Sequence, residues 1–224
     1  MLVALDTSTK YAGVALYDER GVLAESNWLA DGSHTVQLLP TLERLLAALG
    51  AEARGLRAVG VALGPGSFTG LRVAVSAAKG LCLALDIPFI GVGTLAATAY
   101  QQRLAGVPVC ALVDAGRGQL HGTVYEAGEA RWPPQGPGGI ATLAELLDRV
   151  ERTTIFCGEV DERAARAIRD NLDGLAIVAS PATGTRRAAA LAELAWGRYL
   201  AGEADDLAAV QPLYLARPGS QPGA

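Results

Sequence analysis

An internal repeat is the feature of this 224-residue sequence that most restricts its fold. Residues 2–6 form a short apolar run that ends in an aspartate, and residues 109–114 repeat that run. The two aspartates, Asp6 and Asp114, are 108 residues apart, and the same distance separates Tyr17 from Tyr125. Self-similarity at a fixed distance indicates a duplicated structural unit. The sequence therefore predicts two successive copies of one arrangement of strands and helices.

Hydrophobic periodicity and turn residues predict the elements of each copy. In the first copy we expect strands at 2–5, 13–17, 22–29, 58–63 and 87–92, and helices from 33 or 35 to 49, at 68–85 and at 94–104. In the second we expect strands at 109–114, 154–156 and 175–179 beside a second hairpin, and helices at 143–150, 162–171 and 186–200. Thr142 is the expected cap of the first of these helices, and Thr185 is that of the last.

Alternation of strands and helices in two successive halves implies a two-lobed α/β architecture. The predicted lobes are residues 1–106 and 107–224, the second being smaller and carrying a tail. Residues 130–139 are rich in proline and glycine and predict an exposed loop. The tail from Ala208 is expected to be partly extended or mobile.

Charge and composition argue against several classes of function. The formal net charge is −4, the sequence pI is about 5.2, and no long run of lysine or arginine occurs. Proteins that bind nucleic acid without a partner usually carry a basic face, so strong binding of tRNA or DNA by this chain alone is not expected.

Cysteine usage and the ends of the apolar runs indicate a cytoplasmic protein. Cys82, Cys110 and Cys157 have apolar neighbours and long spacings, so we interpret them as buried hydrophobic residues and not as a disulfide framework. No basic segment precedes the first apolar run, and the longest apolar stretches are interrupted before they reach membrane-spanning length. We expect no membrane association.

Three segments are candidate nucleotide or anion sites: the loop after Asp6, the loop after Asp114 and a glycine-rich turn. Asp6, Thr7 and Ser8 follow the first strand, and Asp114 ends its repeat, so the two turns could face each other across a cleft. Gly66 and Ser67 lie in a glycine-rich turn before a helix, whose free N–H groups favour an anion. The turn lacks the lysine of a P-loop. The alternative interpretation is that both aspartates cap turns, and that the glycine-rich segment is a strand-to-helix turn with close backbone approach. Ser67 or Thr69 can cap the helix that follows it.

The helices expected at 38–49 and 68–85 are apolar on more of their surface than one contact requires. The second helix has a small-residue side and a bulky side, and a helix that is apolar nearly all round must be covered on nearly all sides. One interpretation is a helical pair whose outer face docks on another subunit. The other is burial of both helices in the core of this chain.

Catalytic and metal-binding patterns are missing from the sequence. The two histidines, His34 and His121, form no zinc-binding spacing, and no Gly-x-Ser-x-Gly elbow occurs. We therefore predict no catalytic residues, no metal site and no cofactor for the isolated chain.

Several motifs resemble the bacterial TsaB (YeaZ) family over the whole length of the chain. They are LDTST at 5–9, GPGSFTGLR at 64–72, AKGL at 78–81, VDAGRG at 113–118 and PLYL at 212–215. The second of these motifs is highly specific, and the others are weaker alone. The second hairpin departs from the family wording, because Gly116, Gln119 and His121 replace an arginine, a glutamate and a tyrosine.

The resemblance implies an actin/Hsp70-like (ASKHA) fold: a duplicated α/β domain with mixed sheets flanked by helices. It implies a non-catalytic dimerisation and activating subunit for N6-threonylcarbamoyladenosine at position 37 of tRNA. The implied partners are the homologue TsaD, which carries the metal site and performs the transfer, and the ATPase TsaE. It further implies a homodimer when the chain is alone, tRNA contact only through the complex, and ATP or ADP only in that complex.

The resemblance also implies that the first two helices of the N-terminal lobe bind both TsaD and a second copy. Carried over to this sequence, the interface residues are Leu38, Leu42, Leu45, Leu46, Phe68, Leu71, Arg72, Val75, Ala78 and Lys79. Two enzyme hypotheses remain open beside it. One is a kinase-like ATPase that uses Asp6 and Asp114, and the other is a hydrolase of the peptidase type, for which no activated nucleophile is evident.

Overall fold

The computed structural model describes residues 1–30, 32–114, 119–126 and 140–214. Two five-stranded mixed sheets form its two lobes, in the orders β3-β2-β1-β4-β5 and β10-β9-β6-β7-β8. Read from the other edge, the second order is β8-β7-β6-β9-β10, so each strand of the second sheet is the counterpart of the strand five places earlier. The predicted duplication and the two-lobed α/β architecture are confirmed.

The first half of the chain contains β1 (Leu2–Asp6), β2 (Tyr11–Asp18), β3 (Gly21–Leu29), α1 (His34–Ala48), the 3₁₀ turn η1 (Ala53–Gly55), β4 (Ala58–Gly64), α2 (Phe68–Leu85), β5 (Phe89–Gly93) and α3 (Thr94–Tyr100). The second half contains β6 (Val109–Asp114), β7 (Leu120–Tyr125), β8 (Ala141–Thr142), α4 (Leu143–Leu147), β9 (Thr154–Gly158), α5 (Glu162–Leu172), β10 (Ala176–Val178), α6 (Pro181–Gly184) and α7 (Ala188–Leu200).

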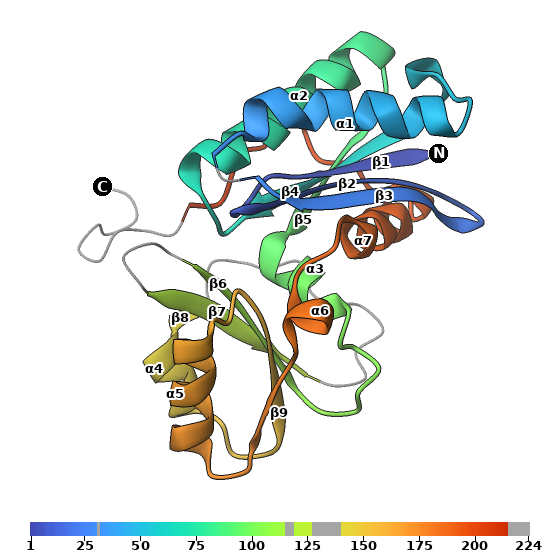
Figure 1. Cartoon of the computed structure of the whole chain (residues 1–224). Helices are drawn as coiled ribbons and strands as arrows, with labels where there is room; N and C mark the ends of the chain where they lie inside the picture. Colours follow the sequence, from blue (N-terminus) through green and yellow to red (C-terminus); the bar gives the residue numbers. More distant parts are fainter. Residues whose placement is uncertain (31, 115–118, 127–139, 215–224) are drawn as a thin grey trace.

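Alternation along β1 divides the first lobe into two hydrophobic layers. Val3 and Leu5 face α1 and α2, whereas Leu2 and Ala4 face α7. In Figure 1, α1 and α2 cover one face of this sheet, and α7 lies on the other. The second sheet packs against α3 on one face and against α4 and α5 on the other. Both repeated strands are thus buried on both sides.

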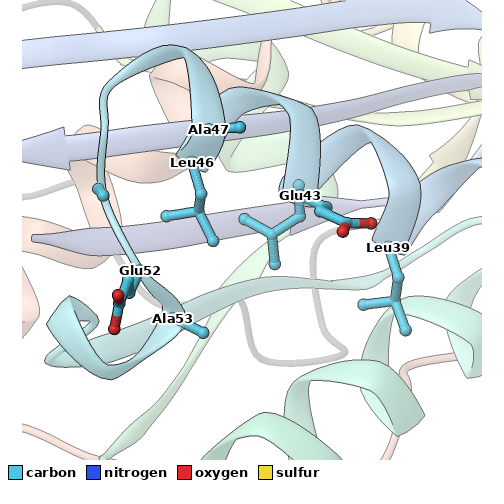
Figure 2. Close-up of a pocket in the computed structure, with 8 residues that line it drawn as sticks. Leu39, Glu43, Leu46, Ala47, Glu52 and Ala53 are labelled. Carbon is cyan, nitrogen blue, oxygen red and sulfur yellow. The ribbon is translucent and has the colours of Figure 1, made fainter.

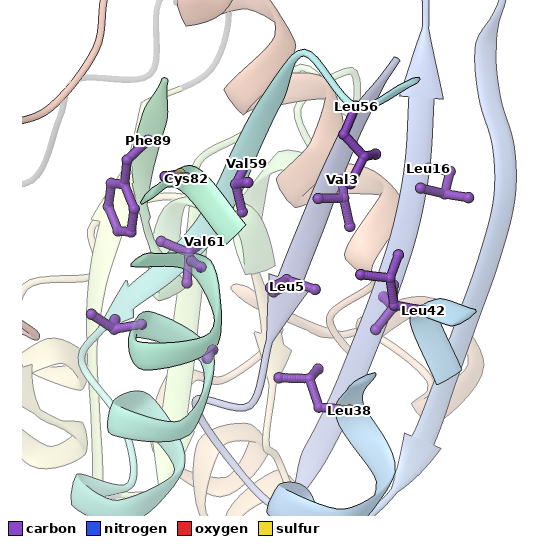
Figure 3. Close-up of a cluster of buried hydrophobic side chains, with 14 of the residues drawn as sticks. Val3, Leu5, Leu16, Leu38, Leu42, Leu56, Val59, Val61, Cys82 and Phe89 are labelled. Atoms are coloured by element: carbon purple, nitrogen blue, oxygen red, sulfur yellow. The ribbon is translucent and has the colours of Figure 1, made fainter. Parts of the chain in front are cut away.

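The leucine stripe of α1 fills the layer above the first sheet. Leu38, Leu42 and Leu46 recur every four residues, so they lie on one side of the helix. Figure 3 shows Leu38 and Leu42 directed toward the strands that carry Val3, Leu5 and Leu16. Pro40 lies near the middle of this continuous 15-residue helix.

Several predicted boundaries differ from the structure. The third helix ends at Tyr100 and not at Leu104. The last helix begins at Ala188, and the Thr185 hydroxyl donates to Pro181 O, so Thr185 does not cap that helix. Thr142 does cap α4, in a reciprocal pair with Glu145. The predicted exposed loop at 130–139 lies outside the described residues.

Residues beyond the second sheet return to the first lobe. The final helix, α7, packs on β1, β2 and β4, and the chain after it runs along β5 and α2. The predicted division at residues 106 and 107 stays a prediction, but the second half of the chain contributes this helix and this segment to the first lobe.

One helix of the described residues, α2, is long and apolar enough to cross a membrane by length and composition alone. Its buried residues pack on β4 and β1, and a third of its 18 residues are buried inside the chain. Lys79 and Gly80 interrupt the apolar sequence of this helix, as expected. Phe68 and Leu83 are the large apolar side chains of α2 that stay exposed.

Candidate functional site

The carboxylate of Asp6 is enclosed by groups of the protein itself. Its Oδ1 accepts hydrogen bonds from the Ser8 backbone N–H at 2.8 Å and from the Ser8 hydroxyl at 2.6 Å. Its Oδ2 accepts from Nε of Arg186. Nη2 of the same arginine donates to the Thr9 hydroxyl at 3.2 Å. The Asp6 and Arg186 side chains are only 4% and 3% exposed. The Asp6 carboxylate, predicted to help bind a nucleotide, is therefore paired with Arg186 of the same chain.

The glycine-rich turn packs directly against this first loop. The Ser67 N–H donates to Ser8 O at 2.6 Å, and the Thr7 hydroxyl donates to Gly70 O at 2.6 Å. A Cβ atom added at Gly66 would lie 2.1 Å from Ser8 O, so only glycine permits this approach. The loop after Asp6 and the glycine-rich turn are therefore hydrogen-bonded to each other.

Ser67, one of the two predicted caps, caps α2. Its side-chain oxygen accepts the Gly70 N–H at 3.2 Å. Together with the bond from the Ser67 N–H to Ser8, this hydrogen bond uses donors that an anion would need. The turn is a tight strand-to-helix connection, in which these N–H groups are already paired and do not serve a phosphate.

Asp114 ends β6 at the second loop, and its side chain is exposed. Its backbone N–H donates to Glu159 Oε2 at 2.8 Å. The rest of the loop, residues 115–118, lies outside the described residues, and with it the altered position Gly116. The other two altered positions are described: Gln119 precedes β7, and His121 lies in it. The predicted pairing of this loop with Asp6 across a cleft stays a prediction.

The predicted interface residues divide into two groups by burial. The larger group is buried in the core of this chain: Leu38, Leu42, Leu46, Leu71, Val75 and Ala78. Leu45 and Lys79 are half-buried, and Phe68 and Arg72 are exposed. For the buried group the core interpretation holds, because these side chains form the inward stripes of two helices that cover a sheet.

Other apolar side chains of the two helices remain in contact with solvent. The most exposed are Val36 at 71%, Leu39 at 48%, Leu49 at 40%, Phe68 at 53% and Leu83 at 74%. Sequence reasoning missed all of these except Phe68. Val36 lies two positions before Leu38, and Leu39 lies one position after it, so neither belongs to the inward stripe of leucines spaced by four.

A groove of about 380 Å³ runs beside α1. Leu39, Leu42, Leu46 and Ala47 of the helix line one side, and Ala51 and Ala53 line the other, with Glu43 and Glu52 among them. Figure 2 shows Leu39 and Leu46 projecting from α1 into this space. The groove and these exposed side chains leave apolar groups of both α1 and α2 in contact with solvent.

The cysteines are poor candidates for catalysis. All three thiols are free and buried. Burial raises the pKa of Cys82 to about 11 and that of Cys157 to about 12, and it also raises the pKa of Cys110. A thiol with a raised pKa supplies little thiolate at neutral pH. Among the described residues, no group of three or more His, Cys, Asp or Glu side chains is arranged to hold a metal ion.

Comparison with known proteins decides the family. A family model described as TsaD, tRNA N6-adenosine threonylcarbamoyltransferase, matches residues 28–216. The tRNA threonylcarbamoyladenosine biosynthesis protein TsaB of Bacillus subtilis (strain 168) is 30% identical over 217 residues, which cover 96% of this chain and 93% of that protein. The chain belongs to the TsaB family. It is therefore a protein of tRNA threonylcarbamoyladenosine biosynthesis.

The structural comparison agrees with the TsaB assignment. YeaZ from Pseudomonas aeruginosa superimposes with a TM-score of 0.75 and 25% identity, over 95% of this chain and 99% of that chain. Together with the duplicated sheet order, this confirms the actin/Hsp70-like fold predicted for a TsaB protein. A tRNA N6-adenosine threonylcarbamoyltransferase of Anaeromyxobacter dehalogenans (strain 2CP-1 / ATCC BAA-258) is 42% identical over 88 residues, or 39% of this chain and 25% of that protein.

Proposed function

We propose that this chain is a non-catalytic, activating subunit that binds a TsaD-type homologue through the outer surface of α1 and α2. The observation that carries the proposal is the set of apolar side chains left exposed on these two helices. A protein surface that exposes large apolar residues in one region commonly marks a contact with another protein. The same surface supports a homodimer when the chain is alone, since one patch can serve two partners in turn.

The first loop supports a role without catalysis. The Asp6 carboxylate, which a kinase-like ATPase would need for its metal and phosphate, is paired with Arg186. The guanidinium compensates the charge of the carboxylate and donates to its Oδ2, while Ser8 donates to its Oδ1. The buried cysteines, with their raised pKa values, offer no activated nucleophile for a hydrolase.

The remaining assignments belong to the same proposal. TsaD supplies the active site, a TsaE-type ATPase joins the complex, and tRNA reaches this chain only through that complex. The acidic composition supports indirect tRNA contact, because a net charge of −4 repels a phosphate backbone. Nucleotide enters only with the partners, no cofactor resides in this chain, and the complex works in the cytoplasm.

Charged substitutions on the exposed side of α1 test the proposal. Val36→Glu and Leu39→Glu place a carboxylate on the proposed interface without entering the core, since both side chains are largely exposed. We expect each variant to fold and to bind the TsaD-type protein of the same organism at least about tenfold more weakly, which corresponds to about 1.4 kcal/mol. Isothermal titration calorimetry measures the affinity, and sedimentation velocity measures self-association.

Leu104→Glu is the matched control, because Leu104 is 86% exposed and lies between α3 and β6, away from both helices. It should leave both associations unchanged. If Val36→Glu and Leu39→Glu retain full affinity and full tRNA modification in the reconstituted complex, the assignment of this surface is wrong.

A further inference from the structure

The segment 205–214, here named the C-terminal strap, is hydrogen-bonded to β5, α2 and β4 of the first lobe. It begins at the outer edge of β5, where the Asp205 N–H donates to Phe89 O at 2.9 Å and the Asp205 carboxylate accepts the Gly91 N–H at 2.6 Å. Figure 1 draws it as the red trace beyond α7, leading toward the N-terminal end of α2. The strap therefore covers a sheet edge that would otherwise expose unpaired backbone groups.

The middle of the strap is part of the core. Leu207 and Val210 pack against the cluster of buried residues beneath α1 and α2. The Lys79 ammonium donates to Val210 O at 3.0 Å, which ties the strap to the middle of α2. The half-burial of Lys79, a predicted interface residue, is thus explained by the strap.

The end of the strap lies against the glycine-rich turn. The Leu213 N–H donates to Leu63 O at 2.6 Å. Gly64 has a φ of 117°, and a Cβ atom there would lie 2.3 Å from Leu213 O. Both the backbone conformation and the close approach require glycine, so the specific motif at 64–72 is shaped in part to accept the strap.

Tyr214 completes an aromatic and guanidinium cluster on the first turns of α2. Its ring centroid lies 4.7 Å from that of Phe68, and its hydroxyl oxygen accepts the Arg72 Nε–H at 3.1 Å. The Arg72 guanidinium carbon lies 3.8 Å from the centre of the Phe68 ring. Phe68 nevertheless stays half exposed, so the strap fixes the ring without covering it.

We infer that the C-terminal strap is a positioning element for partner binding, holding Phe68 and Arg72 in the conformation that the TsaD-type partner contacts. This rests on the proposed function. An exposed phenylalanine loses rotamer freedom when a partner binds, and a contact that orders it beforehand reduces that cost. Tyrosine, arginine and large aromatic side chains are also the residues that most often dominate binding energy.

A protein partner fits this cluster better than a nucleic acid. Stacked aromatic rings with an arginine can bind exposed RNA bases, but the chain as a whole carries a net charge of −4. The cluster also adjoins α2, whose apolar surface we assign to the same partner. The strap and the helix thus form one surface built from two distant parts of the sequence.

Substitutions at the end of the strap test the inference. Tyr214→Ala removes the ring, and Leu213→Pro removes the N–H that donates to Leu63 while keeping Tyr214, Phe68 and Arg72. We expect Tyr214→Ala and Leu213→Pro each to bind the TsaD-type protein about tenfold more weakly, as measured by calorimetry. The thermal unfolding midpoint of each variant should stay unchanged. Tyr214→Phe keeps the stacked ring and should stay within about threefold of the original affinity. Leu104→Ala is the control.

The outcomes separate this inference from the proposed function. If the unsubstituted chain fails to bind the TsaD-type protein, the proposed function fails and the inference fails with it. If it binds and Tyr214→Ala binds equally well, the strap serves the fold alone and the inference is wrong. Tighter binding by Tyr214→Ala or Leu213→Pro would show that the strap obstructs the surface. Binding of tRNA by the isolated chain that Tyr214→Ala abolishes would make the cluster an RNA site instead.

Discussion

Asp6 and Arg186 are 180 residues apart in sequence and meet in a buried ion pair. Sequence reasoning placed Asp6 at a functional or capping position, and the structure gives it a partner on the segment before α7. Such a pair carries little net stability when complete but leaves a buried charge when broken. The pair therefore joins the first loop to the segment by which the chain returns from the second lobe.

Replacing Arg186 with methionine should destabilise the protein strongly. Arg186→Met leaves the Asp6 carboxylate buried without its counter-ion, and we expect a loss of about 3–5 kcal/mol in the free energy of unfolding by urea. The double variant Asp6→Asn/Arg186→Met should lose less than Arg186→Met alone, since it removes the charge as well.

The exposed pair Arg152–Glu126 provides the control, because its side chains are 64% and 54% exposed. Arg152→Met should cost less than about 1 kcal/mol. Equal effects of Arg152→Met and Arg186→Met would contradict the structural role given to the buried pair.

The buried cysteines allow a second prediction at the residue scale. Because burial raises their pKa values and shields them from reagent, Cys82, Cys110 and Cys157 should resist iodoacetamide at pH 8 in the folded protein. All three should react in denaturant, as counted by mass spectrometry. Rapid alkylation of the folded protein would indicate that one of the thiols is activated.

At the scale of elements, α1 has two sides with different expected responses to charge. Leu42 is 4% exposed and packs in the core beneath α1, whereas Leu39 is 48% exposed. Leu42→Glu should destabilise the first lobe by more than about 4 kcal/mol, because it buries an unpaired carboxylate. Leu39→Glu should leave the thermal unfolding midpoint nearly unchanged.

Scanning calorimetry of the two variants distinguishes the sides. An equally destabilised Leu39→Glu would mean that the exposed side of α1 contributes to the fold, and it would weaken the case for an interface there. A stable Leu42→Glu would contradict the packing of α1 on the first sheet.

At the scale of the whole molecule, the repeat and the alternation of strands and helices predicted two α/β lobes, whereas the actin/Hsp70-like fold was implied by the resemblance to the TsaB family. Two strands that end in aspartate at a fixed separation predicted the duplication, and the matching strand orders of the two sheets confirm it. Local periodicity also located α1 and α2. It could not say which of their apolar residues face the sheet, because both helices are apolar on several sides.

Contacts between distant segments could not be predicted. Arg72 and Tyr214 are 142 residues apart, and no spacing or composition signal joins them. The same is true of Asp6 and Arg186. In both cases the last part of the chain returns to the first lobe, so a reading of the two halves as separate copies missed these pairs.

Hydrogen exchange measured by mass spectrometry, with and without the TsaD-type protein, tests the central claim most directly. The account predicts that peptides from α1 (34–48) and α2 (68–85) gain protection in the complex, while peptides from α5 (162–172) in the second lobe keep their original rates. Protection confined to the second lobe, or no change in α1 and α2 on formation of a stable complex, would contradict the account.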